Sequence, residues 1–242
     1  MAREQPEQQA PPVQRLRVRY AKRGRLRFTS HRDFSRAFER AVFRARVPMA
    51  YSSGFNPHPR ISYAGAAPTG SASEAEYLEL ALAEVVDPMT VHQALAEALP
   101  DGLDVVEVVV SPGGSLSDLL EASRWRLDVP GTEDEVAAEV TAFLAADSVT
   151  VQRMTKKGLR DLDAREPVVS LAVVGADTPT VTLELLIRHR VPAVRPDDVL
   201  AAMTTLSGRE PGGVPLLTRL EQGPLDTVDT ENPQVRDPLH LG

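Results

Sequence analysis

Apolar and polar positions in the first part of the chain alternate in ways that predict a strand followed by an amphipathic helix. Residues 16–20, LRVRY, alternate apolar with basic residues, which is typical of a strand with one buried face. Ser30 is a favourable helix N-cap, and Asp33 three residues later completes a capping box. Val47-Pro48 ends this helix. Apolar residues recur along it at helical spacing and form one face: Phe34, Ala37, Phe38, Ala41, Val42 and Ala45.

The pattern continues with two strands over residues 60–66 and 75–83 and a helix that begins at Asp87-Pro88. A further apolar strand, LDVVEVVV, follows over residues 103–110. The predicted order is β-α-β-β-α-β, the split βαβ arrangement of a ferredoxin-like domain.

The second half of the chain repeats this order approximately. Its predicted elements are a strand at 124–129, a helix at 132–146, a strand at 148–155, a charged loop at 156–166, strands at 168–174 and 180–187, a helix at 196–206 and a last strand at 214–220. The predicted fold class is therefore α+β, with two ferredoxin-like units of which the second has an extra hairpin.

Polar, proline-rich and acidic segments divide the chain. We expect a disordered N-terminal lead, a first ferredoxin-like domain with a basic helix, a linker, a second ferredoxin-like domain and a disordered acidic tail, over residues 1–13, 14–110, 111–123, 124–221 and 222–242.

Composition excludes several classes of site. The chain has no cysteine, which rules out disulfides, thiolate zinc sites, cysteine-ligated iron–sulfur clusters and a cysteine nucleophile within it. No apolar run approaches the roughly 18 residues that a membrane span needs. The N-terminal residues lack the apolar core of a signal peptide, so we expect no membrane association and a cytoplasmic location.

Charge is distributed unevenly along the chain. The net charge is -7, yet residues 15–60 contain thirteen Lys or Arg and two acids, a local charge of +11. Such a segment attracts an anionic partner even in an acidic protein.

The predicted first helix carries much of this charge as a stripe opposite its apolar face: Arg32, Arg36, Arg40 and Arg44. Phe43 falls within the stripe, a combination that suits phosphate contact and stacking on an unpaired base. Arginines at alternate positions before the helix are expected to extend it: Arg15, Arg17, Arg19, Arg25 and Arg27. Lys157 and Arg160 form a weaker second patch. The alternative is a solvated helix face, because arginine favours helices and its stem covers apolar surface.

Two histidines and a tyrosine flank this helix. His31, Tyr51 and His58 offer general acid–base chemistry, for example at an RNA 2′-hydroxyl, although no spacing nearby completes a metal-ligand set. The segment GFNPHP, residues 54–59, predicts a stiff loop that presents Phe55, Asn56 and His58. Such a loop suits either recognition or a tight structural crossing.

Four motifs together resemble the radical SAM-linked protein family of bacteria. They are RFTSHRD at 27–33, ERAVFRA at 39–45, SGFNPHP at 53–59 and SEAEY at 73–77, and the segment KKGLRDLDARE at 156–166 also resembles that family. The resemblance spans about residues 14–220, with a departure at Pro48-Met49, where the family more often has a leucine after the proline.

The resemblance implies an accessory protein. Members occur beside or fused to radical SAM enzymes, some of the cobalamin-binding type, and near genes for RNase E/G-type and ribosomal proteins. We therefore expect a non-catalytic partner of a radical SAM enzyme that holds no cofactor itself and binds RNA or presents an RNA-related substrate. The candidate contact residues are Arg27, His31, Arg36, Arg40, Phe43, Arg44, Phe55, Asn56, His58, Lys157 and Arg160.

Two alternatives stay open from the residues. One is a metal-independent endoribonuclease or RNA-modifying enzyme that uses His31, Tyr51 and His58. The other is a protein–protein adaptor whose arginines dock an acidic partner.

Overall fold

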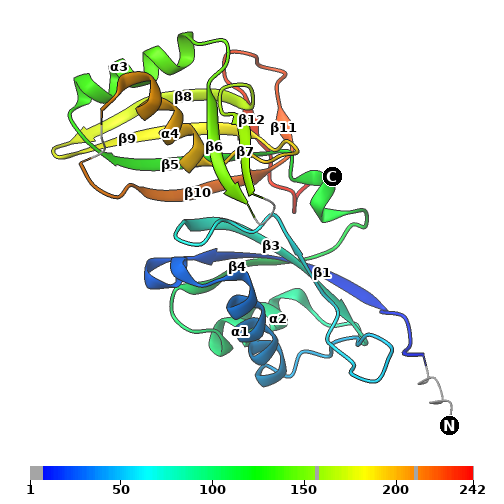
Figure 1. Cartoon of the computed structure of the whole chain (residues 1–242). Coiled ribbons are helices and arrows are strands. Elements are labelled where there is room, and N and C mark those ends of the chain that lie inside the picture. Colours follow the sequence, from blue (N-terminus) through cyan, green and yellow to red (C-terminus); the bar gives the residue numbers. More distant parts are fainter. Residues whose placement is uncertain (1–7, 156–157, 210–211, 242) are drawn as a thin grey trace. The chain divides into compact units, whose positions relative to one another are not determined.

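The computed structural model describes residues 8–155, 158–209 and 212–241. The chain forms two compact units, Met1–Leu119 with Leu239–Gly242, and Leu120–Pro238. The division falls inside the segment 111–123 that the sequence predicts as a linker. Helices and strands occur in both units, so the fold is α+β (Figure 1). No helix among the described residues combines the length and the apolar character that a membrane span requires.

The first unit contains the strands and helices predicted for it. In chain order the predicted elements are β1 (Gln14–Lys22), α1 (His31–Arg44), β2 (Ile61–Ala64), β3 (Ala72–Leu82), α2 (Pro88–Ala98) and β4 (Leu103–Val110). The sequence pattern does not predict two short 3-10 helices, η1 (Gly24–Phe28), which contains Arg25 and Arg27, and η2 (Leu116–Leu119). Its strands pair antiparallel in the order β4-β1-β3-β2.

The core of the first unit lies between this sheet and its two helices. Leu16, Val18 and Tyr20 of β1 are buried together with Phe34 and Phe38 of α1. The rings of Tyr20 and Phe34 stack with centroids 4.5 Å apart. Figure 1 shows α1 and α2 on the same face of the sheet, so the alternation of β1 and the apolar face of α1 predicted one core.

The start of α1 is fixed by its N-cap. The Ser30 hydroxyl accepts a hydrogen bond from the Asp33 backbone N–H at 3.2 Å, as predicted. The Ser30 hydroxyl also donates to the Asp33 carboxylate at 2.7 Å. In the expected capping box the Asp33 carboxylate would accept a bond from the Ser30 backbone N–H. Here it accepts one from the Ser30 hydroxyl.

The helix-free face of this sheet carries ion pairs. Arg15 contacts Glu79 at 2.9 Å, and the buried Arg17 lies 3.5 Å from the same carboxylate and donates to the Gly113 carbonyl at 2.6 Å. Arg23 pairs with Glu74 and with Asp104. The expectation that the arginines of β1 extend the binding surface of α1 is therefore wrong for Arg15 and Arg17, because both pair with the Glu79 carboxylate of β3.

The second unit has a related element order. Its elements are β5 (Ala122–Pro130), α3 (Glu133–Ala145), β6 (Thr150–Thr155), β7 (Gly158–Asp163), β8 (Val168–Asp177), β9 (Thr180–Arg188), α4 (Pro196–Ser207), β10 (Leu216–Gly223), β11 (Leu225–Asp226) and β12 (Gln234–Val235). The main strands pair antiparallel in the order β10-β5-β9-β8. β6 pairs with β7, and β11 with β12.

The structure of this unit differs from two predictions made from the sequence. Most of the predicted charged loop over residues 156–166 is the strand β7, because Leu162 is buried opposite Val151 while Asp161 accepts a bond from Gln152 on the other side of the ribbon. Residues 222–242, predicted as a disordered tail, contain the end of β10 and both short strands β11 and β12.

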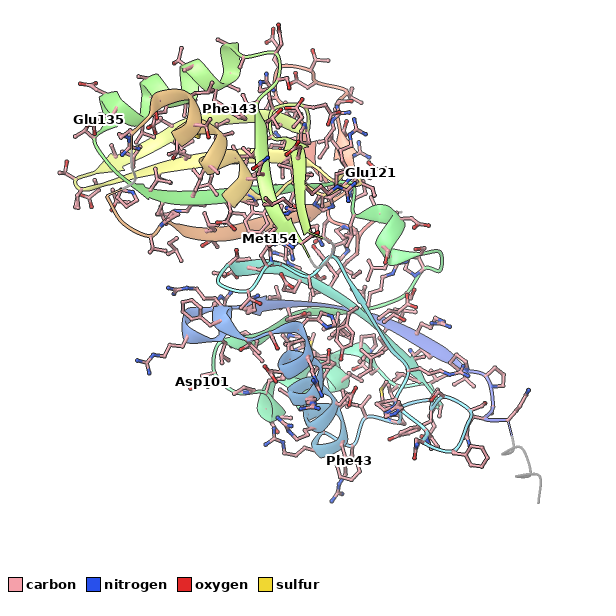
Figure 2. All side chains as sticks on the ribbon, in the orientation of Figure 1. Phe43, Asp101, Glu121, Glu135, Phe143 and Met154 are labelled. Carbon is pink, nitrogen blue, oxygen red and sulfur yellow. The ribbon has the colours of Figure 1, made fainter. Side chains whose placement is uncertain are left out.

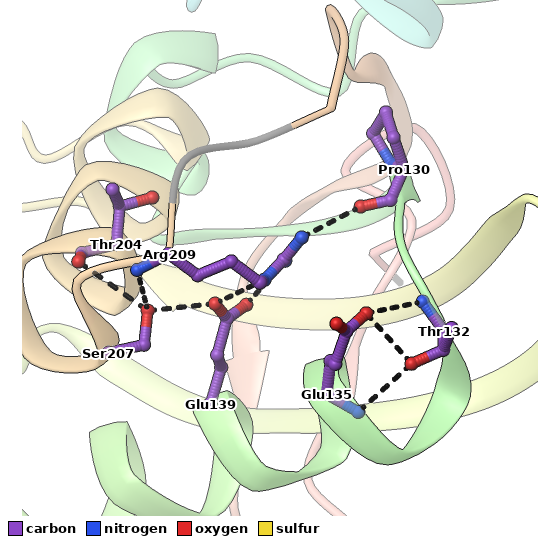
Figure 3. A network of polar contacts seen from close by, with 7 residues as sticks. All are labelled: Pro130, Thr132, Glu135, Glu139, Thr204, Ser207 and Arg209. Carbon is purple, nitrogen blue, oxygen red and sulfur yellow. Dashed lines mark hydrogen bonds and ion pairs between the residues drawn. The ribbon is translucent and has the colours of Figure 1, made fainter.

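A polar network joins α3 to the end of α4 in this unit. The Glu139 carboxylate, which is buried, accepts two bonds from Arg209 at 2.7 and 2.8 Å and one from the Ser207 hydroxyl at 2.8 Å (Figure 3). Arg209 also donates to the Pro130 carbonyl at 3.3 Å. Burial favours a higher pKa for Glu139, but the bonds from Arg209 and Ser207 and the Arg209 charge outweigh it, so its pKa lies below the ordinary value.

The Glu139 network predicts a pH-dependent contribution to stability. Because the pKa of Glu139 is depressed in the folded state, its contribution is complete above the unfolded pKa and is lost as the pH falls through the folded value. We expect Glu139→Gln to lower the free energy of unfolding by about 2 kcal/mol at pH 7, and the difference from wild type to shrink towards pH 3. Urea unfolding between pH 3 and pH 7 measures this.

The exposed Glu133→Gln in the same helix is the matched control, since its carboxylate forms no hydrogen bond or ion pair with a described residue. A difference between Glu139→Gln and wild type that stays constant across the pH range would contradict the assignment.

Candidate functional site

A groove of about 690 Å³ lies between α1 and the segment 51–59 of the first unit. Three arginines, one carboxylate and two aromatic rings line it: Arg36, Glu39, Arg40, Phe43, Arg44, Tyr51 and Pro59. The groove thus brings four sequence-predicted contact residues together with Tyr51, which the sequence offered as part of a catalytic alternative.

The amphipathic pattern of α1 places these side chains. Phe34, Phe38 and Val42 are buried in the core, so the opposite side of the helix faces solvent. Phe43 is 81% exposed and extends from the C-terminal end of α1 (Figure 2). An aromatic ring of this exposure at the end of a short helix adds nothing to the core and is available for stacking.

The arginines of the groove have no carboxylate partner in the described part of the chain. Arg36 and Arg40 form no ion pair with any residue that the structure describes, and Arg44 donates to the Ala98 carbonyl at the end of α2. Glu39 is the one carboxylate in the lining. The groove therefore carries an excess of positive charge that the fold itself does not neutralise.

Hydrogen bonds within the segment 51–59 close the loop that forms one wall of the groove. Tyr51 bridges Pro59, the Ser52 N–H donates to the His58 carbonyl at 2.9 Å, and the His58 N–H donates to the Ser52 hydroxyl at 3.0 Å. Gly54 has a φ of +126°, a conformation that favours glycine. The prediction of a stiff GFNPHP loop agrees with this geometry, and Phe55, Asn56 and His58 are exposed on it outside the groove lining.

His31 contacts the body of the unit. Its ring packs edge-on against Tyr63 of β2 with centroids 5.1 Å apart, and burial raises the pKa of Tyr63 to about 12. His31 begins α1, twelve residues and about 18 Å from Phe43 along the helix axis. Of the proposed catalytic set, Tyr51 alone lines the groove, and no hydrogen bond joins His31, Tyr51 and His58 in the described part of the chain.

The remaining candidates lie elsewhere. The Arg27 guanidinium covers the ring of Phe28 in η1, 4.5 Å from its centroid. Arg160 is exposed on β7 in the second unit, opposite Arg153. Lys157 lies outside the described residues.

Sequence reasoning missed one pair of chemically reactive types, Ser123 and His189. The Ser123 hydroxyl lies 2.5 Å from His189 Nε2, and His189 Nδ1 lies 2.7 Å from the Leu120 carbonyl oxygen. A carbonyl accepts only, so Nδ1 carries the proton and Nε2 accepts from the hydroxyl. This order matches an activated serine, but Ser123 is 1% exposed. The exposed His189 therefore supplies a hydrogen-bond partner to a buried hydroxyl that a substrate does not reach. No local sequence pattern predicts this contact.

Comparison with known proteins places the chain in a family without giving it a function. A sequence model of a family described as an uncharacterized protein conserved in bacteria (DUF2344) matches residues 15–196. No curated protein matches the chain.

Two solved structures show weak similarity. One is a crystal structure of a Cbf5-Nop10-Gar1 complex, with a TM-score of 0.47, 10% identity, and coverage of 90% of this chain and 55% of that chain. The other is the encapsulated DyP-type peroxidase from Mycobacterium smegmatis, with a TM-score of 0.21, 12% identity, and coverage of 90% and 94%. Similarities of this strength assign neither fold nor function.

The closed loop predicts a specific effect of Gly54→Ala. A side chain fits the space there, since nothing lies within 4 Å of an added Cβ, but the φ of +126° strains any L-residue. We expect a less tightly closed loop and faster chymotryptic cleavage after Phe55. Limited proteolysis followed by mass spectrometry measures this, with Gly175→Ala, where no such φ occurs, as the control. Equal cleavage rates in both variants would show that Gly54 does not hold the loop.

Proposed function

Because the chain belongs to an uncharacterized protein family conserved in bacteria, its function has to come from its own surface, and we propose that it is a non-catalytic RNA-binding accessory protein. The groove between α1 and the loop is the binding site. Its arginines contact phosphates, and Phe43 and Tyr51 contact bases.

The observation that carries the proposal is the combination of unneutralised arginines with an exposed ring. Arg36 and Arg40 lie one helical turn apart and lack carboxylate partners among the described residues, and Phe43 stands beside them. An acidic protein surface would satisfy the arginines but would not offer Phe43, which is 81% exposed, a series of flat bases. RNA supplies both phosphates for the arginines and flat bases for the ring.

The groove also supports a binding role over catalysis. General acid–base cleavage needs an ionisable group that titrates near neutral pH within reach of the substrate. His31 packs on Tyr63 and neither histidine lines the groove, so the ionisable side chains that face a bound ligand are three arginines, one carboxylate and a phenol.

Two finer assignments accompany the proposal. We propose that both units are ferredoxin-like, on the support of a shared strand order in which the first strand pairs with the third and the fourth. We also propose a cytoplasmic protein that presents its RNA to a radical SAM enzyme, some of whose relatives bind cobalamin. The support for that partner is the resemblance of the motifs at 27–33, 39–45, 53–59 and 73–77.

The main prediction concerns salt-dependent RNA binding. The double variant Arg36→Ala/Arg40→Ala removes two phosphate contacts, so we expect the dissociation constant for RNA to rise about tenfold or more at 50 mM salt. The slope of log affinity against log salt should fall in magnitude by about 1.4, since each single-strand phosphate contact contributes about 0.7. Fluorescence anisotropy with labelled total bacterial RNA fragments measures both quantities.

Arg190→Ala is the control, an exposed arginine of the second unit that pairs with Glu166. Absence of RNA binding by the wild type at low salt would overturn the proposal. Displacement of RNA by polyglutamate at equal charge concentration would indicate a docking site for an acidic protein in its place.

A second prediction separates binding from cleavage. We expect RNA incubated with the protein to stay intact, with or without EDTA, because no histidine lines the groove. Denaturing gel electrophoresis of end-labelled RNA checks this. Cleavage that persists in EDTA and disappears in His31→Ala would establish the endoribonuclease alternative.

A further inference from the structure

A second exposed aromatic ring stands at the other end of the basic helix. Phe28, the last residue of η1, is 60% exposed. The Arg27 guanidinium covers its ring at 4.5 Å from the centroid. One face of the ring is thus covered by a cation while more than half of the residue is open to solvent, as in an arginine–aromatic platform for a base.

The position of Phe28 is fixed by the fold. The Arg23 N–H donates to the Gly102 carbonyl at 2.8 Å, and Leu26 packs against the hydrophobic core. The Thr29 N–H closes η1 on the Leu26 carbonyl at 2.9 Å, and the Gly70 N–H donates to the Arg27 carbonyl at 2.8 Å. A ring held on an anchored 3-10 turn is presented with little loss of conformational entropy on binding.

The arginine stripe begins four residues after this ring and ends at the groove. Arg32, Arg36, Arg40 and Arg44 recur every fourth residue, so successive arginines rise about 6 Å and the stripe is about 18 Å long. Phe28 precedes Arg32 by four residues, which limits its distance from the stripe to about 14 Å. Phe43 lies at the far end. Arg32, like Arg36 and Arg40, has no ion pair with a described residue.

We infer that this surface is one continuous track for extended single-stranded RNA, with stacking positions for bases at Phe43 and at Phe28. The inference rests on the proposed function and gives the ligand a form and a length. The spacing of the arginines is of the order of the distance between successive phosphates in an extended strand. Paired bases are stacked on each other inside a duplex and are not free to stack on either ring. The track therefore holds about four or more nucleotides and favours single-stranded over duplex RNA.

The test uses the whole protein and 5′-fluorescein oligouridylates of two to ten nucleotides, with affinity measured by fluorescence anisotropy at low salt. Affinity of the wild type should rise steeply with length and then level off once the oligonucleotide reaches both rings. Phe43→Ala should weaken binding of all lengths about fivefold or more, the loss expected for one stacked base. Phe28→Ala should leave the shortest oligonucleotides unaffected and weaken the longer ones by a similar factor. A ten-base-pair duplex should bind more weakly than the ten-nucleotide strand.

Val85→Ala, a substitution at an exposed apolar position of the same unit, is the control. Absence of binding to every oligonucleotide would defeat the proposed RNA-binding function itself. Binding that Phe43→Ala weakens and Phe28→Ala leaves unchanged at all lengths would preserve that function and overturn the two-ring track. Equal affinity for duplex and single strand would also overturn it.

Discussion

The pairing of two arginines on β1 with the Glu79 carboxylate on β3 is the interaction on which the charge distribution of the first unit depends. Arg17 is buried against Glu79, and Arg15 shares the same carboxylate. A buried guanidinium without a counter-charge would be strongly unfavourable, so Glu79 is held on the helix-free face of the sheet. The arginines of α1 lie on a separate surface, where Glu39 is the single carboxylate lining the groove. The positive potential of α1 thus persists because nearby acids are engaged elsewhere.

The sheet of the second unit also pairs an arginine with carboxylates on neighbouring strands. Arg124 of β5 contacts Glu184 of β9 at 2.6 Å and Glu221 of β10 at 2.9 Å. Its helices, however, carry carboxylates at their starts, with Glu135 in a capping box with Thr132 (Figure 3). Two units with the same strand order therefore differ in what their helices show to solvent. Helix α1 presents arginines and α3 presents acids, and this difference is the reason that the RNA site is proposed on the first unit.

Local sequence signals predict the parts of the fold that depend on near neighbours. Ser30, the apolar repeat from Phe34 to Val42, and Pro48 are enough to define α1, and its exposed arginines with Phe43 follow from the same periodicity. Contacts between residues far apart in sequence are not predictable in this way. The residues near Arg17 in sequence do not predict its ion pair with Glu79, and those near Glu139 do not predict its ion pair with Arg209. The charged segment 158–163 is a strand because Leu162 is buried in the hairpin with β6.

The candidate site shows the same division. The arginine stripe is evident from the sequence because its members recur every fourth residue. Tyr51 lines the groove only because the loop that contains it packs beside α1. In the sequence His31 is a candidate for acid–base chemistry, because its packing partner Tyr63 belongs to a strand about thirty residues later and is not evident from the local pattern. Residue type alone does not distinguish a histidine that faces a ligand from one that faces a neighbouring ring.

The spacing of arginines along α1 has a consequence for the free protein as well. Like charges four residues apart on a helix repel, and this repulsion is screened by salt. Raising the ionic strength therefore stabilises α1 in the unliganded protein while it weakens the attraction of the same helix for a polyanion. A bound polyanion and dissolved salt both reduce the repulsion between the arginines of α1. The stabilisation of α1 by added salt should therefore be smaller when a polyanion is bound.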